Sequence, residues 1–453
     1  MAHNEAVGTN AAHDNATETR NEASGARNKA SGARNKASGA NVARDKVVGT
    51  GATARAPRVG VIGGGQLARM MQEAAVPLGI ELRALVEAAD GATGQVVPHS
   101  EVGAADDVAA ILALAEGVDV LTVEHEHVPD GVLAAADKVV PVRPGASSLA
   151  FAQDKLLMRR RLGELGIECP RWFAAKNEED IVEAVRELGG KAILKTPRDG
   201  YDGKGVAEIR LVSQGESRLP EEDVRLETSA PIRRWLADAG DEGVLVEEFV
   251  PFACEIAQLV ARRPGGQTVS WCAVETIQRG GVCSETIAPA RVDADVARRA
   301  AEIAETVADR LGVVGILAVE MFVDATGRVL VNELAMRPHN SGHWTIEGAV
   351  TSQFEQHLRA VLDLPLGATG ERAPWTVMVN LLGSQLEDPR DAFSTAMANN
   401  PAAKIHIYGK EVRPGRKLGH VTVCGDDLDA VRRQAHEVVE ILAGERRGPA
   451  AKG

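Results

Sequence analysis

The first folded part of the chain alternates short apolar runs with helical periods. RVGVI at residues 58–62 predicts a buried strand. The apolar residues after it recur at i, i+3, i+4 and i+7, which predicts an amphipathic helix: Leu67, Met70, Met71 and Ala74. Two strands and a helix are predicted next, at 81–87, at 119–124 and near 106–116. This alternation predicts a parallel, doubly wound sheet.

The pattern changes after about residue 150, where antiparallel strands are expected. The predicted elements are a helix at 153–165, strands at 191–196, 243–250, 255–263 and 268–275, a helix near 293–311, and strands at 315–323 and 328–335. The stretch 207–243 is polar without a clear period, so we interpret it as a loop-rich insertion. From about residue 374 short strands and turns predominate. The expected fold class is therefore α/β followed by α+β.

Residues 1–56 differ from the rest in composition. The run ASGARNKASGARNKASGAN at 23–41 repeats every seven residues, but its only apolar residues are alanines and glycine recurs in each copy. Such a repeat cannot bury enough surface to offset chain entropy, so a disordered low-complexity tail is predicted. Its basic residues could contact an anionic surface, or the tail could simply be solvated.

Composition excludes several classes of protein. A net charge of −13 argues against nucleic acid as the main partner. No apolar run approaches the length of a membrane span, and the N-terminus lacks an apolar signal region. The five cysteines are scattered without a CxxC pair. They fit free thiols in a cytoplasmic protein better than a disulfide framework or a zinc site.

GGGQLA at residues 63–68 joins the first strand to the first helix. It fits the G-x-G-x-x-A dinucleotide fingerprint, and Glu87 ends the second strand where a ribose-binding acid would lie. A nicotinamide-dependent oxidoreductase is therefore one hypothesis. The alternative is a tight turn that favours glycine for its shape and binds some other phosphate.

Two more segments carry groups suited to a nucleotide. LKTPRDGYDGKGV at 194–206 places glycines between Lys195 and Lys204, and its backbone amides could fold over a polyphosphate. It is not a P-loop, and Asp202 could be an ordinary turn former. VLVEEFV at 244–250 puts Glu247 and Glu248 on opposite faces at a strand end, which could equally be a solvated edge.

The strands at 315–323 and 328–335 predict a hairpin that carries two carboxylates. If paired residue numbers add to about 651, Glu320 opposes Val331, and Glu333 is its diagonal neighbour on the same face, roughly 7 Å away. Two carboxylates on one face are costly to bury unless a cation lies between them. Oxygen ligands favour magnesium, with manganese as an alternative. A one-residue bulge would instead separate the pair.

The second strand of the hairpin ends in NELAMRPHNSGHW, which is rich in cations and hydrogen-bond donors. These groups suit a phosphorylated or polyhydroxyl ligand beside the metal: Arg337, His339, Asn340, Ser341 and His343.

With these residues in view, the chain resembles the 5-(carboxyamino)imidazole ribonucleotide synthase family of the ATP-grasp superfamily. The resemblance covers residues 57–445 and rests on motifs that occur together in order: GGGQLARMM, GYDGKG, EEFVPF, ETIAPA, NELAMRPHNSGHW and EVRPGRKLGH. It implies an ATP-grasp fold in three parts. These are a Rossmann-like pre-ATP-grasp domain at 57–150, an ATP-grasp domain at 151–373 with a lid at about 168–250, and a small β-rich C-terminal part at 374–445.

The resemblance also implies roles for individual residues. ATP would be bound by Lys155, Lys195, Gly200, Tyr201, Asp202, Gly203, Lys204, Gly205, Val206, Glu247, Glu248, Phe249, Val250, Glu255, Gln278, Asn332 and Glu333. Glu320 and Glu333 would hold magnesium. The ribonucleotide would be bound by Gly64, Gly65, Gln66, Leu67, Glu124, Arg337, His339, Asn340, Arg413, Arg416 and Lys417. Asp202, Tyr201 and Lys195 would be catalytic.

Four features depart from the family's pattern. Lys155 stands where arginine is more usual, Gln278 replaces a histidine, Met336 replaces a proline, and the 207–243 segment is longer. The carboxylates and the glycine loop are kept, so activity is expected.

The predicted reaction joins aminoimidazole ribonucleotide to bicarbonate with ATP, through carboxyphosphate, and releases ADP and phosphate. Asp202 would orient the substrate amine and accept its proton. The resemblance implies a homodimer acting on small molecules, without nucleic acid or membrane. The alternatives are another ATP-grasp ligase of purine or carboxylation metabolism, and the oxidoreductase named above.

Overall fold

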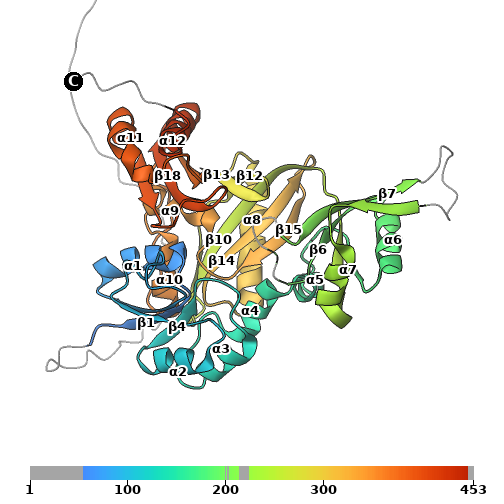
Figure 1. Ribbon diagram of the computed structural model, residues 1–453, viewed down its shortest axis with the longest axis horizontal. Coiled ribbons are helices and arrows are strands. Elements are labelled where there is room, and N and C mark those ends of the chain that lie inside the picture. The colour runs from blue at the N-terminus through green and yellow to red at the C-terminus, as the bar shows by residue number, and fades with distance from the viewer. Residues whose placement is uncertain (1–54, 199, 201–203, 214–223, 447–453) are drawn as a thin grey trace, which may run out of the picture. The chain divides into compact units, whose positions relative to one another are not determined.

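The computed structural model describes residues 55–198, 200, 204–213 and 224–446 (Figure 1). The predicted tail therefore lies outside the described residues except for its last two positions. Within the described ranges the helices and strands form one compact unit built on three sheets. In this part of the chain, no helix combines the length and apolar character needed to cross a membrane.

The first sheet is parallel and has the strand order β3-β2-β1-β4. Its strands are β1 (Arg58–Ile62), β2 (Glu81–Val86), β3 (His99–Val102) and β4 (Val120–Val123). The helices of this region are α1 (Gln66–Leu78), α2 (Val108–Glu116) and α3 (Asp130–Ala136). The doubly wound sheet expected from strand–helix alternation is thus present. Strand β3 lies at the edge with mostly exposed, polar residues, so it has no apolar run that the sequence could reveal.

The second sheet is antiparallel, with the order β5-β9-β6-β7-β8. Its strands are β5 (Trp172–Ala175), β6 (Lys191–Lys195), β7 (Val206–Ser213), β8 (Val224–Thr228) and β9 (Val244–Glu248). The accompanying helices are α6 (Glu178–Glu187), α7 (Ile232–Ala239) and the 3-10 helix η1 (Gly240–Glu242). We call these elements the lid region.

The prediction of a loop-rich insertion at 207–243 is wrong. That stretch contains nearly all of β7, together with β8 and α7, although residues 214–223 lie outside the described part. The strands are hard to recognise because one face is solvated, so Glu208 and Arg210 interrupt the apolar residues. Helix α7 packs Ile232, Trp235 and Leu236 onto the lid core, at i, i+3 and i+4.

The third sheet runs from the central region into the C-terminal part without a break. Its order is β15-β14-β10-β12-β13-β16-β18-β17, with β11 paired to β10. The strands are β10 (Phe252–Arg262), β11 (Thr268–Ser270), β12 (Val274–Arg279), β13 (Val282–Ala288), β14 (Gly315–Asp324), β15 (Val329–Ala335), β16 (Trp375–Leu382), β17 (Lys404–Ile407) and β18 (Lys417–Gly425). Pairing of β13 with β16 joins the central and C-terminal regions.

The third sheet is accompanied by the remaining helices (Figure 1). They are α4 (Ala146–Gln153), α5 (Lys155–Glu164), α8 (Ala294–Arg310), η2 (Asn340–Gly342), α9 (Thr345–Gly348), α10 (Gln353–Val361), η3 (Pro389–Ala392), α11 (Phe393–Asn399) and α12 (Leu428–Leu442). Of these, α8 and α10 pack on β10 and β14, and α12 packs on β16 and β18. Sequence reasoning did not foresee α12, which buries Val431, Ala435 and Val438 against β16 and β18. The C-terminal part is therefore a sheet covered by helices as well as strands and turns.

Candidate active site

The two hairpin carboxylates lie directly opposite each other. Glu320 of β14 pairs with Glu333 of β15, whereas the next pair is Met321 with Val331. Asn332 is thus an extra residue, which makes a β-bulge. The predicted register, with Val331 opposite Glu320, is wrong. The alternative, a bulge that separates the carboxylates, is also wrong: the bulge brings them face to face, because without it Glu320 would oppose Asn332.

A third carboxylate lies on the same face of the sheet. Ala257 of β10 pairs with Glu320, so Glu255, two residues earlier, is a diagonal neighbour. Burial, together with the nearby charges of Glu333 and Glu255, raises the pKa of Glu320 to about 8. Burial also raises the pKa of Glu255 to about 7, although Gln278 donates a hydrogen bond to it. Carboxylates in this state need a proton or a cation as partner.

These carboxylates can contribute only part of a metal ion's ligands. Among the described residues, no group of three or more His, Cys, Asp or Glu side chains is placed to hold a metal ion. A cation here would need oxygen ligands from a bound substrate as well, as magnesium commonly has.

His339 follows β15 and contacts Glu320 of the carboxylate pair. Its Nε2 lies 3.4 Å from Oε1 of Glu320, and its Nδ1 lies 2.8 Å from Oγ of Ser341. Burial, reinforced by the charges of Arg337 and Lys417, lowers the pKa of His339 well below its usual value. The imidazole is therefore neutral at physiological pH and does not favour the charged form of Glu320.

A buried ion cluster lies on the other side of the bulge. Lys195 Nζ is 2.6 Å from Oε2 of Glu247, and Nε of Arg159 binds the second oxygen, Oε1. Both cations also hold Asn332: Lys195 donates to its Oδ1 at 2.9 Å, and Arg159 donates to its main-chain oxygen at 2.7 Å. Burial raises the pKa of Glu247, but the charges of Arg159 and Lys195 outweigh burial and lower it to about 2.

Lys155 connects the carboxylate pair to the glycine loop. Its Nζ lies 3.7 Å from Oε1 of Glu333 and donates to the carbonyl of Gly200 at 3.3 Å. The loop returns to the lid sheet at Gly205, whose carbonyl accepts from the amide of Thr196 at 2.9 Å. The structure thus brings Lys155, Lys195 and both ends of the loop together. Three of the predicted site residues lie outside the described part: Tyr201, Asp202 and Gly203.

The end of β9 is not a plain solvated edge. Glu247 is buried in the ion cluster, whereas Glu248 on the opposite face pairs with Arg171 at 3.4 Å. Phe249 is partly exposed, and Lys191 Nζ lies 3.2 Å from its ring centroid. The predicted nucleotide residues Phe249 and Val250 directly follow β9, beyond the cluster.

The N-terminal glycine turn is occupied by side chains of the protein itself. The amide of Gly64 donates to Glu87 at 3.0 Å, while Glu124 accepts from the amides of Gly65 and Ala68, the latter at 3.0 Å. Burial raises the pKa of Glu124. In a dinucleotide fold these amides face a pyrophosphate. Carboxylates already fill that position, which removes the basis of the oxidoreductase hypothesis.

Four other predicted substrate residues either bond to side chains of the protein itself or lie in its interior. Gln66 accepts a hydrogen bond from Lys410, whereas the side chain of Leu67 is packed in the core. Arg337 is held by Glu126, 2.8 Å from its Nε. Asn340 is buried beside His339.

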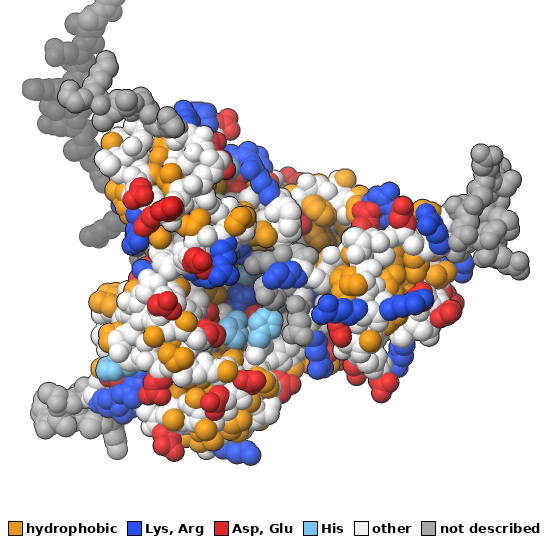
Figure 2. Space-filling view, viewed as in Figure 1, with side chains coloured by type: hydrophobic (Ala, Val, Ile, Leu, Met, Phe, Trp, Pro, Cys, Tyr) orange, Lys and Arg blue, Asp and Glu red, His pale blue; other side chains and the backbone are white. Residues whose placement is uncertain are grey.

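The predicted cations of the C-terminal part differ in their position relative to the carboxylate pair. Lys417 lies near enough to Glu320 to influence its pKa. Arg413 and Arg416 both pair with Glu411 on the loop before β18, and the side chain of Arg413 is well exposed. On the face shown in Figure 2, histidine, lysine and arginine side chains gather in a central hollow.

Sequence reasoning missed three residues that support this site. Arg159 lies at i+4 from Lys155 on the buried face of α5, and that spacing could have revealed it. Glu126 lies in the sequence EHEH, and no nearby sequence pattern indicates that it pairs with Arg337. Gln353 is completely buried at the start of α10, and both its side-chain groups bind the main chain of His339, each at 2.8 Å.

Comparison with known proteins decides the family. A ribonucleotide synthetase preATP-grasp domain matches residues 57–153, and an ATP-grasp domain matches 160–354. A phosphoribosylaminoimidazole carboxylase C-terminal domain matches 376–434. The N5-carboxyaminoimidazole ribonucleotide synthase of Mycobacterium tuberculosis is 46% identical over 398 residues, covering 86% of this chain and 89% of the relative. The chain belongs to the N5-carboxyaminoimidazole ribonucleotide synthase family.

Solved structures of this family share the fold. The Thermus thermophilus enzyme superposes with a TM-score of 0.72 at 35% identity, over 86% of this chain and 100% of that one. The Aspergillus clavatus synthase, in complex with ADP and 5-aminoimidazole ribonucleotide, gives 0.73 at 29%, over 85% and 98%. The predicted fold class, enzyme class and function are confirmed: an ATP-dependent enzyme of purine biosynthesis that forms N5-carboxyaminoimidazole ribonucleotide.

Proposed function

We propose that the chain carries out this reaction with bicarbonate and magnesium, in two steps at adjoining parts of one site. Bicarbonate oxygen attacks the γ-phosphorus of ATP, giving carboxyphosphate and ADP. The exocyclic amine of aminoimidazole ribonucleotide then attacks the carboxyl carbon, or the carbon dioxide released from it. Phosphate leaves, the amine loses a proton, and the carboxyamino product remains.

Glu320 and Glu333 are the residues that would hold magnesium. Their direct opposition and the raised pKa of Glu320 fit a site built for a cation. When bound, the ion would neutralise phosphate charge, which is the main requirement of phosphoryl transfer. Manganese would suit the same oxygen ligands.

In the ATP half, Lys195 and Lys155 would neutralise phosphate oxygens, and the loop Gly200–Val206 would cover them. Lys195 is already oriented by Glu247 and Asn332, so little reorganisation is needed on binding. The strand end Glu247–Val250, together with Glu255 and Gln278, would hold the remainder of the nucleotide. Lysine at position 155 keeps the charge of the usual arginine without its bidentate geometry.

In the substrate half, Asp202 would accept the proton of the attacking amine, with Tyr201 beside it. Arg337, His339, Asn340 and Lys417 would surround the ribonucleotide, with Arg413 and Arg416 closing over its phosphate. Neutral His339 can orient a ligand by hydrogen bonding without adding charge. The turn at Gly64–Leu67 and Glu124 would form the wall on the N-terminal side.

The observation that carries this proposal is the carboxylate pair, with Lys155 and Lys195 converging on the same bulge. The test is ADP release and carboxyamino product measured in the same samples, with bicarbonate, aminoimidazole ribonucleotide and Mg²⁺ omitted in turn. ADP release independent of bicarbonate, or product formed without Mg²⁺, would contradict it.

We also propose that the chain acts in the cytoplasm as a homodimer. All five cysteines are free thiols in the structure, as a reducing compartment would keep them. Sedimentation equilibrium of the full chain would test the dimer, which is contradicted if the mass stays that of one chain at micromolar concentration.

A further inference from the structure

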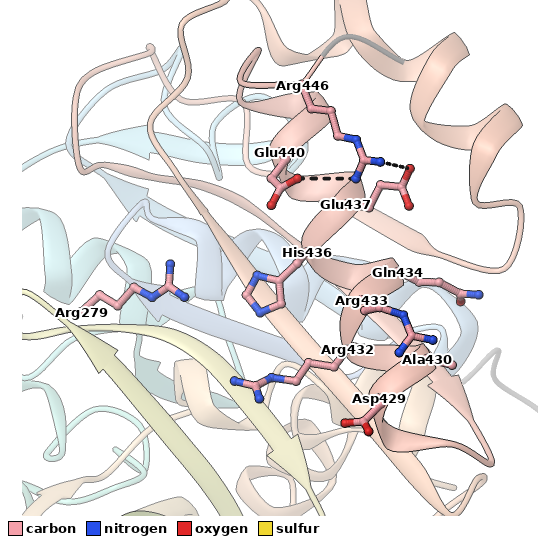
Figure 3. A pocket seen from close by; sticks show the side chains of 10 residues that line it. All are labelled: Arg279, Asp429, Ala430, Arg432, Arg433, Gln434, His436, Glu437, Glu440 and Arg446. Carbon is pink, nitrogen blue, oxygen red and sulfur yellow. Dashed lines mark ion pairs between the residues drawn. The ribbon is translucent and has the colours of Figure 1, made fainter. Parts of the chain in front are cut away.

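A cavity of about 740 Å³ lies beside α12, on the C-terminal part of the third sheet (Figure 3). Its basic side chains come from different elements: Arg279 from the end of β12, and Arg432, Arg433 and His436 from α12. In Figure 3 the guanidinium of Arg279 points across the cavity toward His436 and Arg432. We call these four residues the arginine pocket. None of them belongs to the site described above.

A buried carboxylate fixes one wall of the arginine pocket. Glu285 of β13 is fully buried, and Arg432 binds it with Nε at 2.6 Å and Nη2 at 3.0 Å. His436 Nε2 lies 3.1 Å from the same carboxylate. Burial raises the pKa of Glu285, but His436 and Arg432 outweigh burial and lower it. Arg432 and His436 are therefore held in place, and Nη1 of Arg432 takes no part in the contact with Glu285.

The other charged side chains that line the cavity leave the end formed by the arginine pocket positively charged. Within the described ranges, Arg279 and Arg433 form no ion pair. The acidic side chains Glu437 and Glu440 lie at the other end, where Arg446 engages them at 3.6 and 3.7 Å. Asp429, in the first turn of α12, is the remaining carboxylate of the lining. On a chain with a net charge of −13, three arginines lining one end of a cavity are a local exception.

We propose that the arginine pocket binds an oxyanion of the phosphate class. Guanidinium groups present paired donors that match phosphate oxygens, and they stay charged at any physiological pH. The ligand would be free phosphate or pyrophosphate, or the phosphates of a nucleotide. Arg279 directly follows Gln278, which bonds Glu255 in the active site, so the pocket adjoins the strand that carries a proposed nucleotide residue.

Calorimetric titration of the full chain with pyrophosphate, in EDTA, tests the proposal. Lys195→Ala disables phosphate binding in the active site, and binding to the pocket should persist in it. Arg279→Gln and Arg433→Gln in that background should each weaken binding about tenfold or more, the worth of one charge-assisted contact. Arg234→Gln, an equal charge change on the exposed side of α7, should have no effect.

Three results would overturn the proposal: loss of all binding in Lys195→Ala alone, unchanged affinity in both pocket variants, or no binding below about 10 mM. Because Arg279 and Arg433 are exposed, Tm should stay unchanged in both variants, which separates lost binding from lost folding. A parallel ADP titration of the unsubstituted chain and of Arg279→Gln shows whether the bound phosphate group belongs to a nucleotide or to a free anion. A second ADP site that Arg279→Gln removes indicates a nucleotide, whereas a single unaffected ADP site indicates a free phosphate anion.

Discussion

Glu320 and Glu333 face each other because one residue, Asn332, is inserted between the paired positions of β14 and β15. The inserted residue is itself held from the other side by Lys195 and Arg159. The proposed metal carboxylates and the proposed phosphate lysine are therefore fixed by the same bulge. A change that removes the bulge would disturb both.

Glu333→Gln should lose ATP turnover by about 10²-fold or more while the protein stays folded, because an amide cannot replace the charge that balances a divalent cation. Turnover measured against Mg²⁺ concentration is the test, with Glu302→Gln on the exposed face of α8 as control. An unchanged Mg²⁺ dependence would rule out the assignment.

Asp202→Asn should uncouple the two steps, since asparagine keeps the size of the side chain but cannot accept a proton. Bicarbonate-dependent phosphate release should persist, while product formation falls by about 10²–10⁴. Lys195→Ala should instead lower both together, because it removes phosphate binding common to each step. If Asp202→Asn reduces both in proportion, the residue serves ATP binding or the loop's fold.

Gln353→Leu should raise KM for aminoimidazole ribonucleotide about tenfold or more with little change in KM for ATP. The substitution frees the main chain of His339, which Gln353 holds by two bonds of 2.8 Å. Gln356→Leu is a matched control, because Gln356 of the same helix holds Gly367 by two bonds of the same length. Equal changes in both variants would show that Gln353 contributes only to stability.

The chain should lose stability in acid partly through His357. Burial lowers its pKa to about 3, and its ring bonds Thr122 at 2.8 Å and the amide of Ile316 at 3.2 Å. Because the folded pKa lies below the unfolded value, the neutral ring's contribution is complete above about pH 6.5 and declines as pH falls toward 3, by about 1.4 kcal/mol per unit.

Urea unfolding at pH 7.5 and pH 5.0 measures this contribution. His357→Gln should be less stable than the natural chain at pH 7.5 but should lose about 2 kcal/mol less on acidification. His99→Gln, at an exposed position on β3, should behave like the natural chain. Parallel losses in all three proteins would exclude His357 as the titrating group.

Sequence patterns predicted the elements whose apolar runs or helical periods stand out along the chain. The helical period of α1 and the apolar runs of β1, β2 and β4 predicted the first sheet except for its edge strand β3. The 207–243 stretch was misjudged because its strands are solvated on one face. The register at Glu320 could not be predicted, since a bulge depends on tertiary contacts to the inserted residue. Residue roles and the domain boundaries near 150 and 373 stay predictions.

The occupied glycine turn has a consequence for the use of sequence fingerprints. GGGQLA specifies a backbone shape with inward amides, and in this chain Glu87 and Glu124, which follow the two strands on either side of β1, accept hydrogen bonds from those amides. The same six-residue motif can therefore have amides that are open to an anion or amides that are already bonded to the protein's own carboxylates. Shortening Glu124 to alanine would leave the amides of Gly65 and Ala68 without their carboxylate partner and open the turn to an anionic ligand.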